Sequence, residues 1–222
     1  MKKIILITIG DINGIGIEIL LKIWKTNKNN KFILLTDINF LKKYLVKKKI
    51  CIELKKINNE LEENKKLDFN NYLHIFDFKS ETNEKNEYNS LLHSYKLLKT
   101  YSCFSGVVNL PINKYNIIKK IDKKFIGQTE FYKDQSKSKV ANMIFVYKKI
   151  IFTTLTTHVS LKNVNKHLFE KNFILNKIIS LNKSLINDFK ITKPKIVISG
   201  INPHSGENNT LGNEESVYLK PI

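Results

Sequence analysis

The sequence contains no arginine, although it is strongly basic. All 38 of its Lys and Arg residues are lysines, and 20 acidic residues leave a formal net charge of +18. Bidentate recognition of bases and phosphates favours the planar fork of arginine. The lysines are scattered over many segments, and heavy use of Lys, Asn and Ile fits a bias towards AT-rich codons. We therefore expect no dedicated nucleic-acid partner, only weak, salt-dependent attraction to polyanions.

Cysteines are few, and long apolar runs are missing. Cys51 and Cys103 form no Cys-x-x-Cys pair, which argues against a disulfide framework or a cysteine zinc site. The apolar start of the chain breaks at Gly10 and Asp11 without a small-residue cleavage site, so a signal peptide is not expected. No run approaches the roughly 18 apolar residues of a membrane helix. We expect a cytoplasmic protein that has no membrane partner.

The first half of the chain alternates apolar strands with helical segments. Residues 4–9 form a continuous apolar run, typical of a strand buried on both faces, and a glycine-rich loop and a helix over 17–25 follow. The order repeats at 32–35, where Asp37 is the expected N-cap of the next helix. This alternation predicts an α/β fold with a largely parallel sheet flanked by helices.

The second half predicts a different arrangement. Two β-rich runs, 140–147 and 150–157, have the pattern of an antiparallel hairpin. One long helix is expected over 161–185, followed by a short apolar strand over 196–198. We therefore expect two α/β domains, residues 1–126 and residues 127–222, with the active site in the cleft between them.

Two histidines follow predicted strands in the second domain. His158 ends the segment TTH, and His204 lies in the loop after residues 196–198. A β-α-β crossover would bring both to one rim of a sheet, where two imidazoles suit a divalent metal. Such a site needs about three protein ligands. Glu207 or a side chain of another subunit could complete the set, and the simpler alternative is a loop histidine bonded to backbone.

Polar groups also lie at the starts of two predicted helices close to the expected domain boundary. Lys114 opens a short helix directly after the segment LPIN, which sets a cation beside a strand end. Gln128 and Thr129 begin another helix, where exposed N–H groups favour anions. For Thr129 a simple N-cap role is the alternative.

The glycine-rich loop also fits a short-chain-type dehydrogenase. Gly10, Gly14 and Gly16 follow the first strand with the spacing of a dinucleotide loop, and Tyr115-x-x-x-Lys119 matches the proton-transfer pair of that class. The same Tyr-x-x-x-Lys pattern also occurs at Tyr44. Ile17 stands where small residues are expected beside a pyrophosphate. We keep this class as a less favoured alternative.

Five ordered segments carry a more specific resemblance. They are GDINGIGIE, LPINK, GQTEF, TTHVSL and GINPHSGE with LGNEE, and together they span residues 10–215. The 4-hydroxythreonine-4-phosphate dehydrogenase family of vitamin B6 biosynthesis has GDPAGIGPE, TGPINK, GHTEF, TTHLPL and GLNPHAGE with GxEE in the same order. The chain therefore resembles this family over essentially its whole length. The fold that the resemblance implies is similar to that of isocitrate and isopropylmalate dehydrogenases.

The resemblance implies roles for individual residues. His158 and His204 match two metal-binding histidines, Gln128 and Thr129 match the substrate-contacting pair of GHTEF, and Lys114 matches a catalytic lysine. Gln128 departs from the family histidine, because an amide can hydrogen-bond but cannot shuttle a proton. The family chain continues beyond Ile222 with a third metal histidine in an HDQG segment and most of its cofactor site, so the cofactor-binding residues here are unknown.

The implied reaction is the metal-assisted, NAD- or NADP-dependent oxidation and decarboxylation of 4-phosphooxy-L-threonine to 3-amino-2-oxopropyl phosphate. The implied partners are this small phosphorylated amino acid, a divalent metal (zinc, magnesium or cobalt) and a second copy of the chain in a homodimer. The alternative is a truncated, non-catalytic remnant of the family that keeps part of the metal and phosphate site.

Overall fold

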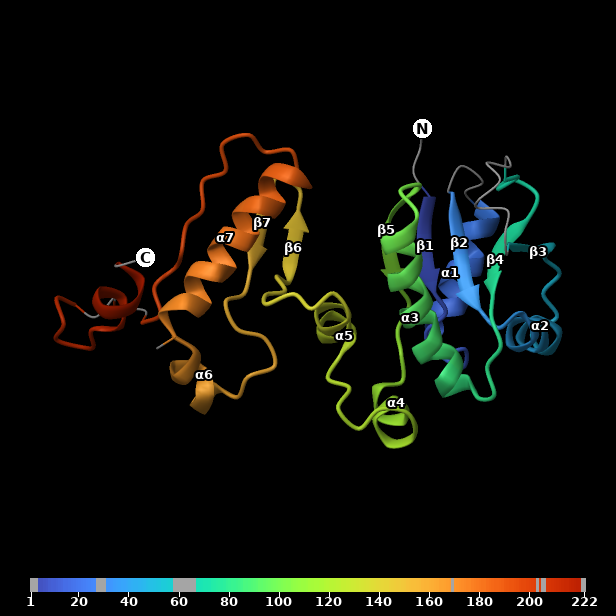
Figure 1. Cartoon of the computed structure of the whole chain (residues 1–222), viewed down its shortest axis with the longest axis horizontal. Coiled ribbons are helices and arrows are strands. Elements are labelled where there is room, and N and C mark those ends of the chain that lie inside the picture. Colours follow the sequence, from blue (N-terminus) through green and yellow to red (C-terminus); the bar gives the residue numbers. More distant parts are fainter. Residues whose placement is uncertain are drawn as a thin grey trace. The chain divides into compact units, whose positions relative to one another are not determined.

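The computed structural model describes residues 4–26, 31–57, 67–168, 170–202, 204 and 207–220. The chain folds into two compact units, residues 1–135 and 136–222. The first contains a five-stranded sheet and the second a two-stranded sheet (Figure 1). The domain boundary expected after residue 126 stays a prediction.

The first unit is built on a parallel sheet whose strand order is β3-β4-β2-β1-β5. This order places β1 and β2 in the interior of the sheet, where apolar side chains are needed on both faces. The observation confirms the parallel α/β fold predicted from the alternating pattern. The strands are β1 (Ile4–Thr8), β2 (Phe32–Thr36), β3 (Leu54–Ile57), β4 (Leu73–Asp77) and β5 (Phe104–Asn109).

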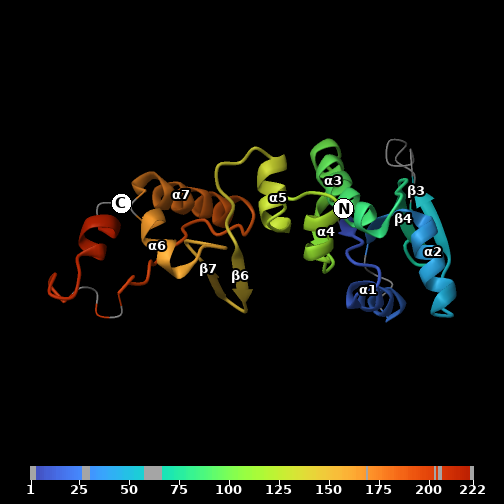
Figure 2. The same cartoon turned by 90° about the horizontal axis from the view of Figure 1, so that it is seen from below.

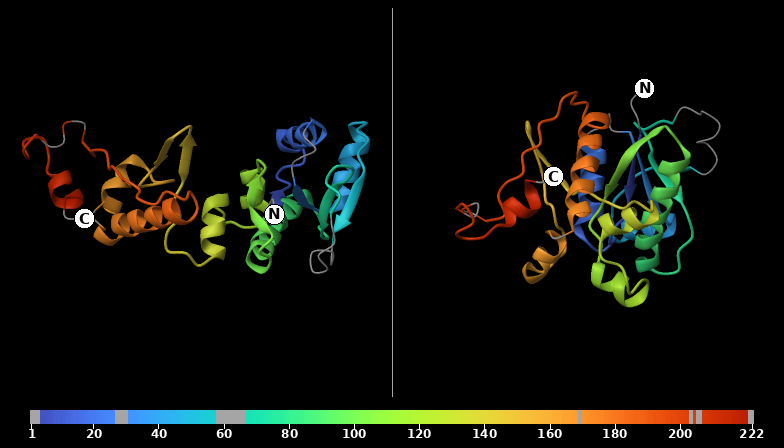
Figure 3. Two further views of the ribbon diagram at one scale, coloured as in Figure 1. Left: turned by 90° about the horizontal axis from the view of Figure 1, so that it is seen from above. Right: turned by 60° about the vertical axis from the view of Figure 1, so that its left-hand side comes forward.

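Helices cover both faces of this sheet. Successive residues of β2 point to opposite sides: Leu34 packs with buried residues of α1 and α2, whereas Ile33 packs with Leu97 of α3. Figures 2 and 3 show α1 and α2 on one side of the sheet and α3 on the other. The helices are α1 (Ile15–Thr26), α2 (Ile38–Lys47) and α3 (Asn83–Thr100).

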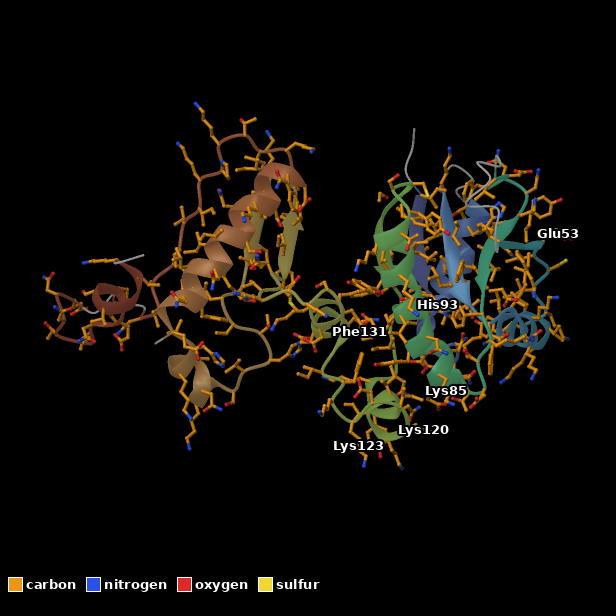
Figure 4. The ribbon with its side chains drawn as sticks, in the orientation of Figure 1. Glu53, Lys85, His93, Lys120, Lys123 and Phe131 are labelled. Atoms are coloured by element: carbon orange, nitrogen blue, oxygen red, sulfur yellow. The ribbon has the colours of Figure 1, made fainter. Side chains whose placement is uncertain are left out.

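Two short helices pack on α3 away from the sheet. They are α4 (Lys114–Lys120) and α5 (Gln128–Gln135). Leu91 of α3 and Ile117 of α4 are fully buried in a cluster with Phe125 and Phe131, the last labelled on α5 in Figure 4. This cluster fixes the segments LPINK and GQTEF against α3.

The described residues of the second unit form a hairpin, two α-helices and a short π-helix, Glu215–Leu219. Strands β6 (Ile144–Tyr147) and β7 (Ile150–Thr153) are antiparallel, as predicted, although shorter than expected. The single helix predicted over 161–185 is wrong, because the chain forms α6 (Leu161–Leu168) and α7 (Lys171–Asn187). The break arises at Glu170, whose φ of −84° and ψ of 87° lie outside the helical region.

The strand predicted over residues 196–198 is also wrong. These residues form no strand, and β6 and β7 pair only with each other in the part of the chain that the structure describes. Residues 194–201 instead line a cavity of about 840 Å³ together with side chains of β7 and α7. A strand requires a neighbouring strand for its backbone hydrogen bonds, and residues 196–198 have none among the described residues.

The glycine-rich loop after β1 interlocks with the loop after β5. The Asp11 N–H donates to the Pro111 carbonyl oxygen at 2.8 Å. Gly10 has a φ of +60°, and a Cβ placed on it would lie 2.4 Å from that oxygen. A Cβ on Gly16 would lie 3.0 Å from Leu110 Cβ. The two glycines therefore make room for the chain's own segment, residues 110–111.

We predict that Gly10→Ala destabilises the first unit by about 2–4 kcal/mol, from a left-handed φ and a backbone clash. Chemical denaturation followed by the fluorescence of Trp24 measures this. Trp24 is the only tryptophan and is buried in this unit. Gly106→Ala is the matched control, because a Cβ on Gly106 meets nothing within 4 Å. Equal stability of the two variants would contradict the interlock.

Candidate active site

The candidate site of the first unit lies at the carboxyl ends of β1 and β5. Thr8 and Asn109, the last residues of these strands, face each other in register, and Thr8 Oγ1 donates to Asn109 Oδ1 at 3.0 Å. Ligands of open α/β sheets bind outside this edge. The segments GDING and LPINK both begin here.

Leu110 and Pro111 fill the glycine loop. A Cβ on Gly10 would clash with the Pro111 carbonyl oxygen at 2.4 Å, and a Cβ on Gly16 would crowd Leu110 and Pro111 at 3.0 Å. A dinucleotide pyrophosphate needs this space for itself, since the glycines of such loops serve close approach of the phosphates. This packing argues against the short-chain-type alternative.

Lys114 is the first residue of α4, and its side chain is exposed. The preceding residue, Asn113, caps the helix because its Oδ1 accepts the Asn116 N–H at 3.1 Å. Ile117, fully buried one turn later, holds α4 against α3. The ammonium group of Lys114 therefore projects from a helix whose start is fixed.

Gln128 joins a third segment to this group. It is the first residue of α5, and its Nε2 donates to the Leu110 carbonyl oxygen at 3.1 Å. Thr129 follows it, and both residues are half-buried. The structure thus brings GQTEF onto LPINK and LPINK onto GDING. The roles of Lys114, Gln128 and Thr129 stay predictions.

A polar network supports the same edge of the sheet. The Tyr132 hydroxyl donates to Asn109 Oδ1 at 2.9 Å and lies 2.7 Å from Ser94 Oγ. Burial raises the pKa of Tyr132 to about 12, so its hydroxyl stays protonated at neutral pH. Tyr132 therefore ties α5 to the end of β5 as a fixed hydrogen-bond donor.

Glu87 is a buried acid that the sequence motifs do not predict. It lies on α3 with 2% of its surface exposed, and its Oε2 accepts the Asn113 N–H at 3.0 Å. Burial raises the pKa of Glu87 to about 7, with Asp11 and Glu84 adding to the rise and the Asn113 bond opposing it. The sequence holds one indication that Glu87 is buried. It lies four residues before Leu91, on the same face of the helix.

In the second unit, His158 follows β7 at a distance. The strand ends at Thr153 rather than at Thr157, so four residues separate it from the histidine. His158 is exposed and has a φ of +56°. Its expected place directly at a strand end is therefore wrong, and its role as a metal ligand stays a prediction.

His204 lies in a loop tied down by acidic side chains. Its Nδ1 is 2.8 Å from Glu207 Oε1, and its N–H donates to Asn202 Oδ1 at 2.9 Å. The N–H groups of Ile201 and Asn202 both donate to Glu215 Oε1 at 2.8 Å. The bond from Asn202, foremost among several hydrogen bonds, lowers the pKa of Glu215. This loop is held by the LGNEE segment.

The donor chemistry of this loop fits a metal-binding histidine. A ligating imidazole commonly gives its other ring N–H to a carboxylate, as Glu207 allows here, which leaves Nε2 for the metal. His158 offers a second, exposed imidazole. Within the described ranges, no group of three His, Cys, Asp or Glu side chains could hold a metal ion. The fit is therefore that of a partial ligand set.

Comparison with known proteins identifies one family: the family model described as "Pyridoxal phosphate biosynthetic protein PdxA" matches residues 28–222. A 4-hydroxythreonine-4-phosphate dehydrogenase from Wigglesworthia glossinidia brevipalpis is 31% identical over 100% of this chain and 69% of its own length. One from Sulfurihydrogenibium is 32% identical over 97% of this chain and 68% of its own. The chain thus spans about two thirds of these relatives.

Solved structures show the same fold. The 4-hydroxythreonine-4-phosphate dehydrogenase of Klebsiella pneumoniae superposes with a TM-score of 0.81 at 19% identity, covering 100% of this chain and 69% of the other. A putative enzyme of this name from Salmonella typhimurium superposes with a TM-score of 0.80 at 21% identity, covering 99% of this chain and 70% of the other. These likenesses confirm the α/β architecture.

Glu87 predicts a pH-dependent stability. Its pKa is about 7 in the folded state against 4.5 normally, so the folded state binds more protons between these values. The free energy of unfolding should therefore fall as pH rises from about 4.5 to 7. Glu87→Gln removes this effect. We expect the free energy of unfolding of the variant, relative to that of the wild type, to rise by roughly 1–3 kcal/mol from pH 5 to pH 8.

Denaturation followed by Trp24 at several pH values measures the difference between variant and wild type, in which other titrating groups cancel. Glu81→Gln is the control. The hydrogen bond with Lys85 is the main cause that lowers the pKa of Glu81, so its titration does not change the free energy of unfolding between pH 5 and 8. A difference for Glu87→Gln that stays flat from pH 5 to 8 would disprove the prediction.

Proposed function

Because the chain belongs to the family of the pyridoxal phosphate biosynthetic protein PdxA, we propose that it acts as a 4-hydroxythreonine-4-phosphate dehydrogenase. The observation that carries the proposal is the whole-chain match to the Wigglesworthia enzyme. The reaction would be the NAD- or NADP-dependent oxidation of 4-phosphooxy-L-threonine and its decarboxylation to 3-amino-2-oxopropyl phosphate.

The chemistry requires two groups besides the protein. When bound, a divalent metal (zinc, magnesium or cobalt) lowers the pKa of a coordinated alcohol, and a nicotinamide accepts a hydride. His158 and His204 would hold the metal. The Glu207 carboxylate would keep the Nδ1 proton of His204 in place and so preserve Nε2 as a ligand.

The first unit would bind the substrate. Lys114 offers an exposed positive charge to an anionic substrate and to negative charge that develops in the reaction. One N–H of Gln128 Nε2 donates to the Leu110 carbonyl oxygen, which leaves Oε1 as an acceptor and the second N–H as a donor. An amide cannot carry a proton, which restricts Gln128 to binding and orientation.

A non-catalytic remnant is the second candidate. It is supported by Gln128, which stands where the family has a histidine, because an amide cannot shuttle a proton. Such a protein would bind the metal weakly and the substrate phosphate without turnover. The two candidates differ in a single measurable property, which is turnover.

We also propose a homodimer and a cytoplasmic location. The family resemblance supports both. Among the described residues, no helix is long and apolar enough to cross a membrane.

We predict that His204→Ala lowers zinc affinity at least about 100-fold and Glu207→Gln about 10-fold, because the first removes a ligand and the second its support. Isothermal calorimetry with zinc measures both. His167→Ala, on α6 of the same unit, is the control and should bind as the wild type does. Unchanged affinity in His204→Ala would remove His204 from the metal site.

We further predict that the chain reduces NAD or NADP in the presence of the phosphorylated substrate and a divalent metal. Lys114→Met should lower kcat/KM about 100-fold, as expected for loss of one charge-stabilising group. Lys119→Met, a change of another exposed lysine on α4, should leave it unchanged. Absence of turnover by the wild-type chain would favour the remnant.

A further inference from the structure

The buried carboxyl of Glu87 lies behind the loop that carries Lys114. It comes from α3, whereas the N–H group it binds belongs to Asn113, in the loop between β5 and α4. Glu84, one turn earlier on α3, binds Lys120 of α4 at 2.7 Å. Figure 4 labels Lys120 on α4. Two acids of α3 therefore reach α4 or its N-cap, and of these two Glu87 is the buried one.

Burying an acid at this position costs free energy. A buried carboxylate loses hydration, and a single N–H bond recovers only part of it. Asp11, in the loop after β1, and Glu84, on the same helix α3, add repulsion. A buried glutamine would keep an acceptor for the Asn113 N–H without placing a charge in the interior. Ionisable groups held at such a cost are common at functional sites.

The loop after β5 is held near both of its ends, in addition to the bond from Gln128 Nε2 to the Leu110 carbonyl oxygen. Near its start the Pro111 carbonyl oxygen accepts the Asp11 N–H at 2.8 Å, and near its end Glu87 accepts the Asn113 N–H at 3.0 Å. Asn113 is also the N-cap of α4, and Lys114 follows it directly. A shift of Asn113 therefore moves the Lys114 backbone, while the buried Ile117 keeps the rest of α4 in place.

We infer that Glu87 is a positioning residue: by accepting the Asn113 N–H it fixes the turn from which Lys114 reaches the substrate. The inference rests on the role proposed for Lys114. Because an ionised carboxylate is the stronger acceptor, the turn is held more firmly when Glu87 is charged. Its pKa near 7 places this change within the physiological range.

The test compares Glu87→Ala, Glu87→Gln and the exposed control Glu81→Gln. Glu87→Ala removes the acceptor, so exchange of the Asn113 amide should quicken about tenfold and kcat should fall about tenfold with KM little changed. Glu87→Gln keeps an acceptor of the same length. It should restore most of the protection and of kcat, yet lack the step near pH 7 shown by the wild type. Glu81→Gln should behave as the wild type.

A readout without turnover separates this inference from the proposed function. Reductive ¹³C-methylation keeps the lysine charge, and the Lys114 methyl resonance should shift in Glu87→Ala while that of Lys119 does not. If the wild-type chain shows no turnover, the proposed dehydrogenase activity is contradicted. The exchange rate of the Asn113 amide and the Lys114 methyl resonance would still test the positioning role of Glu87.

The inference is overturned if the Asn113 amide exchanges at the wild-type rate in folded Glu87→Ala. It is also overturned if this amide exchanges faster while kcat and the Lys114 resonance stay as in the wild type. If Glu87→Ala does not fold, the inference is tested by comparing Glu87→Gln with the wild type. A Lys114 resonance that titrates near pH 7 in the wild type and not in Glu87→Gln supports the inference. Titration in both proteins overturns it.

Discussion

The contact between the Asp11 N–H and the Pro111 carbonyl oxygen is the constraint on which the first unit depends. It joins the loops after two adjacent parallel strands, and the absence of a Cβ at Gly10 makes the contact possible. Once these loops are joined, Gln128 can reach Leu110 and Asn113 can reach Glu87. Three motifs far apart in the sequence thereby become one surface, with Lys114 at its edge.

The division of groups between the two units follows from this arrangement. The first unit offers a lysine, an amide and a hydroxyl, which suit an anionic substrate. The second offers two exposed imidazoles, of which that of His204 lies against the Glu207 carboxylate, and imidazoles suit a metal. Each unit stabilises its own set through bonds to nearby backbone, as Glu215 does for the loop of His204. The proposed chemistry needs both sets.

The sequence predicts the first unit well because its central strands are buried on both faces, and short continuous apolar runs between turn residues are typical of such strands. The same reasoning fails at residues 196–198, because an apolar run does not say whether a partner strand exists. It also fails at Glu170, since Leu168 and Ile174 continue the apolar stripe across the break. The motifs predicted roles for Lys114 and His204, and these stay predictions. Glu87 lies outside every motif, and only the packing of α3 shows that it is buried.

The hairpin of the second unit has a further consequence for colloidal behaviour. Its strands pair only with each other among the described residues, and the rings of Phe145 and Phe152 stack while about half exposed. Open edges of this kind attract strands of other molecules. Lys148 and Lys149 at its turn, with the net charge of +18, oppose such pairing by repulsion between copies. Because salt screens that repulsion, the abundance of lysine acts as a solubility device whose strength depends on the ionic strength of the surroundings.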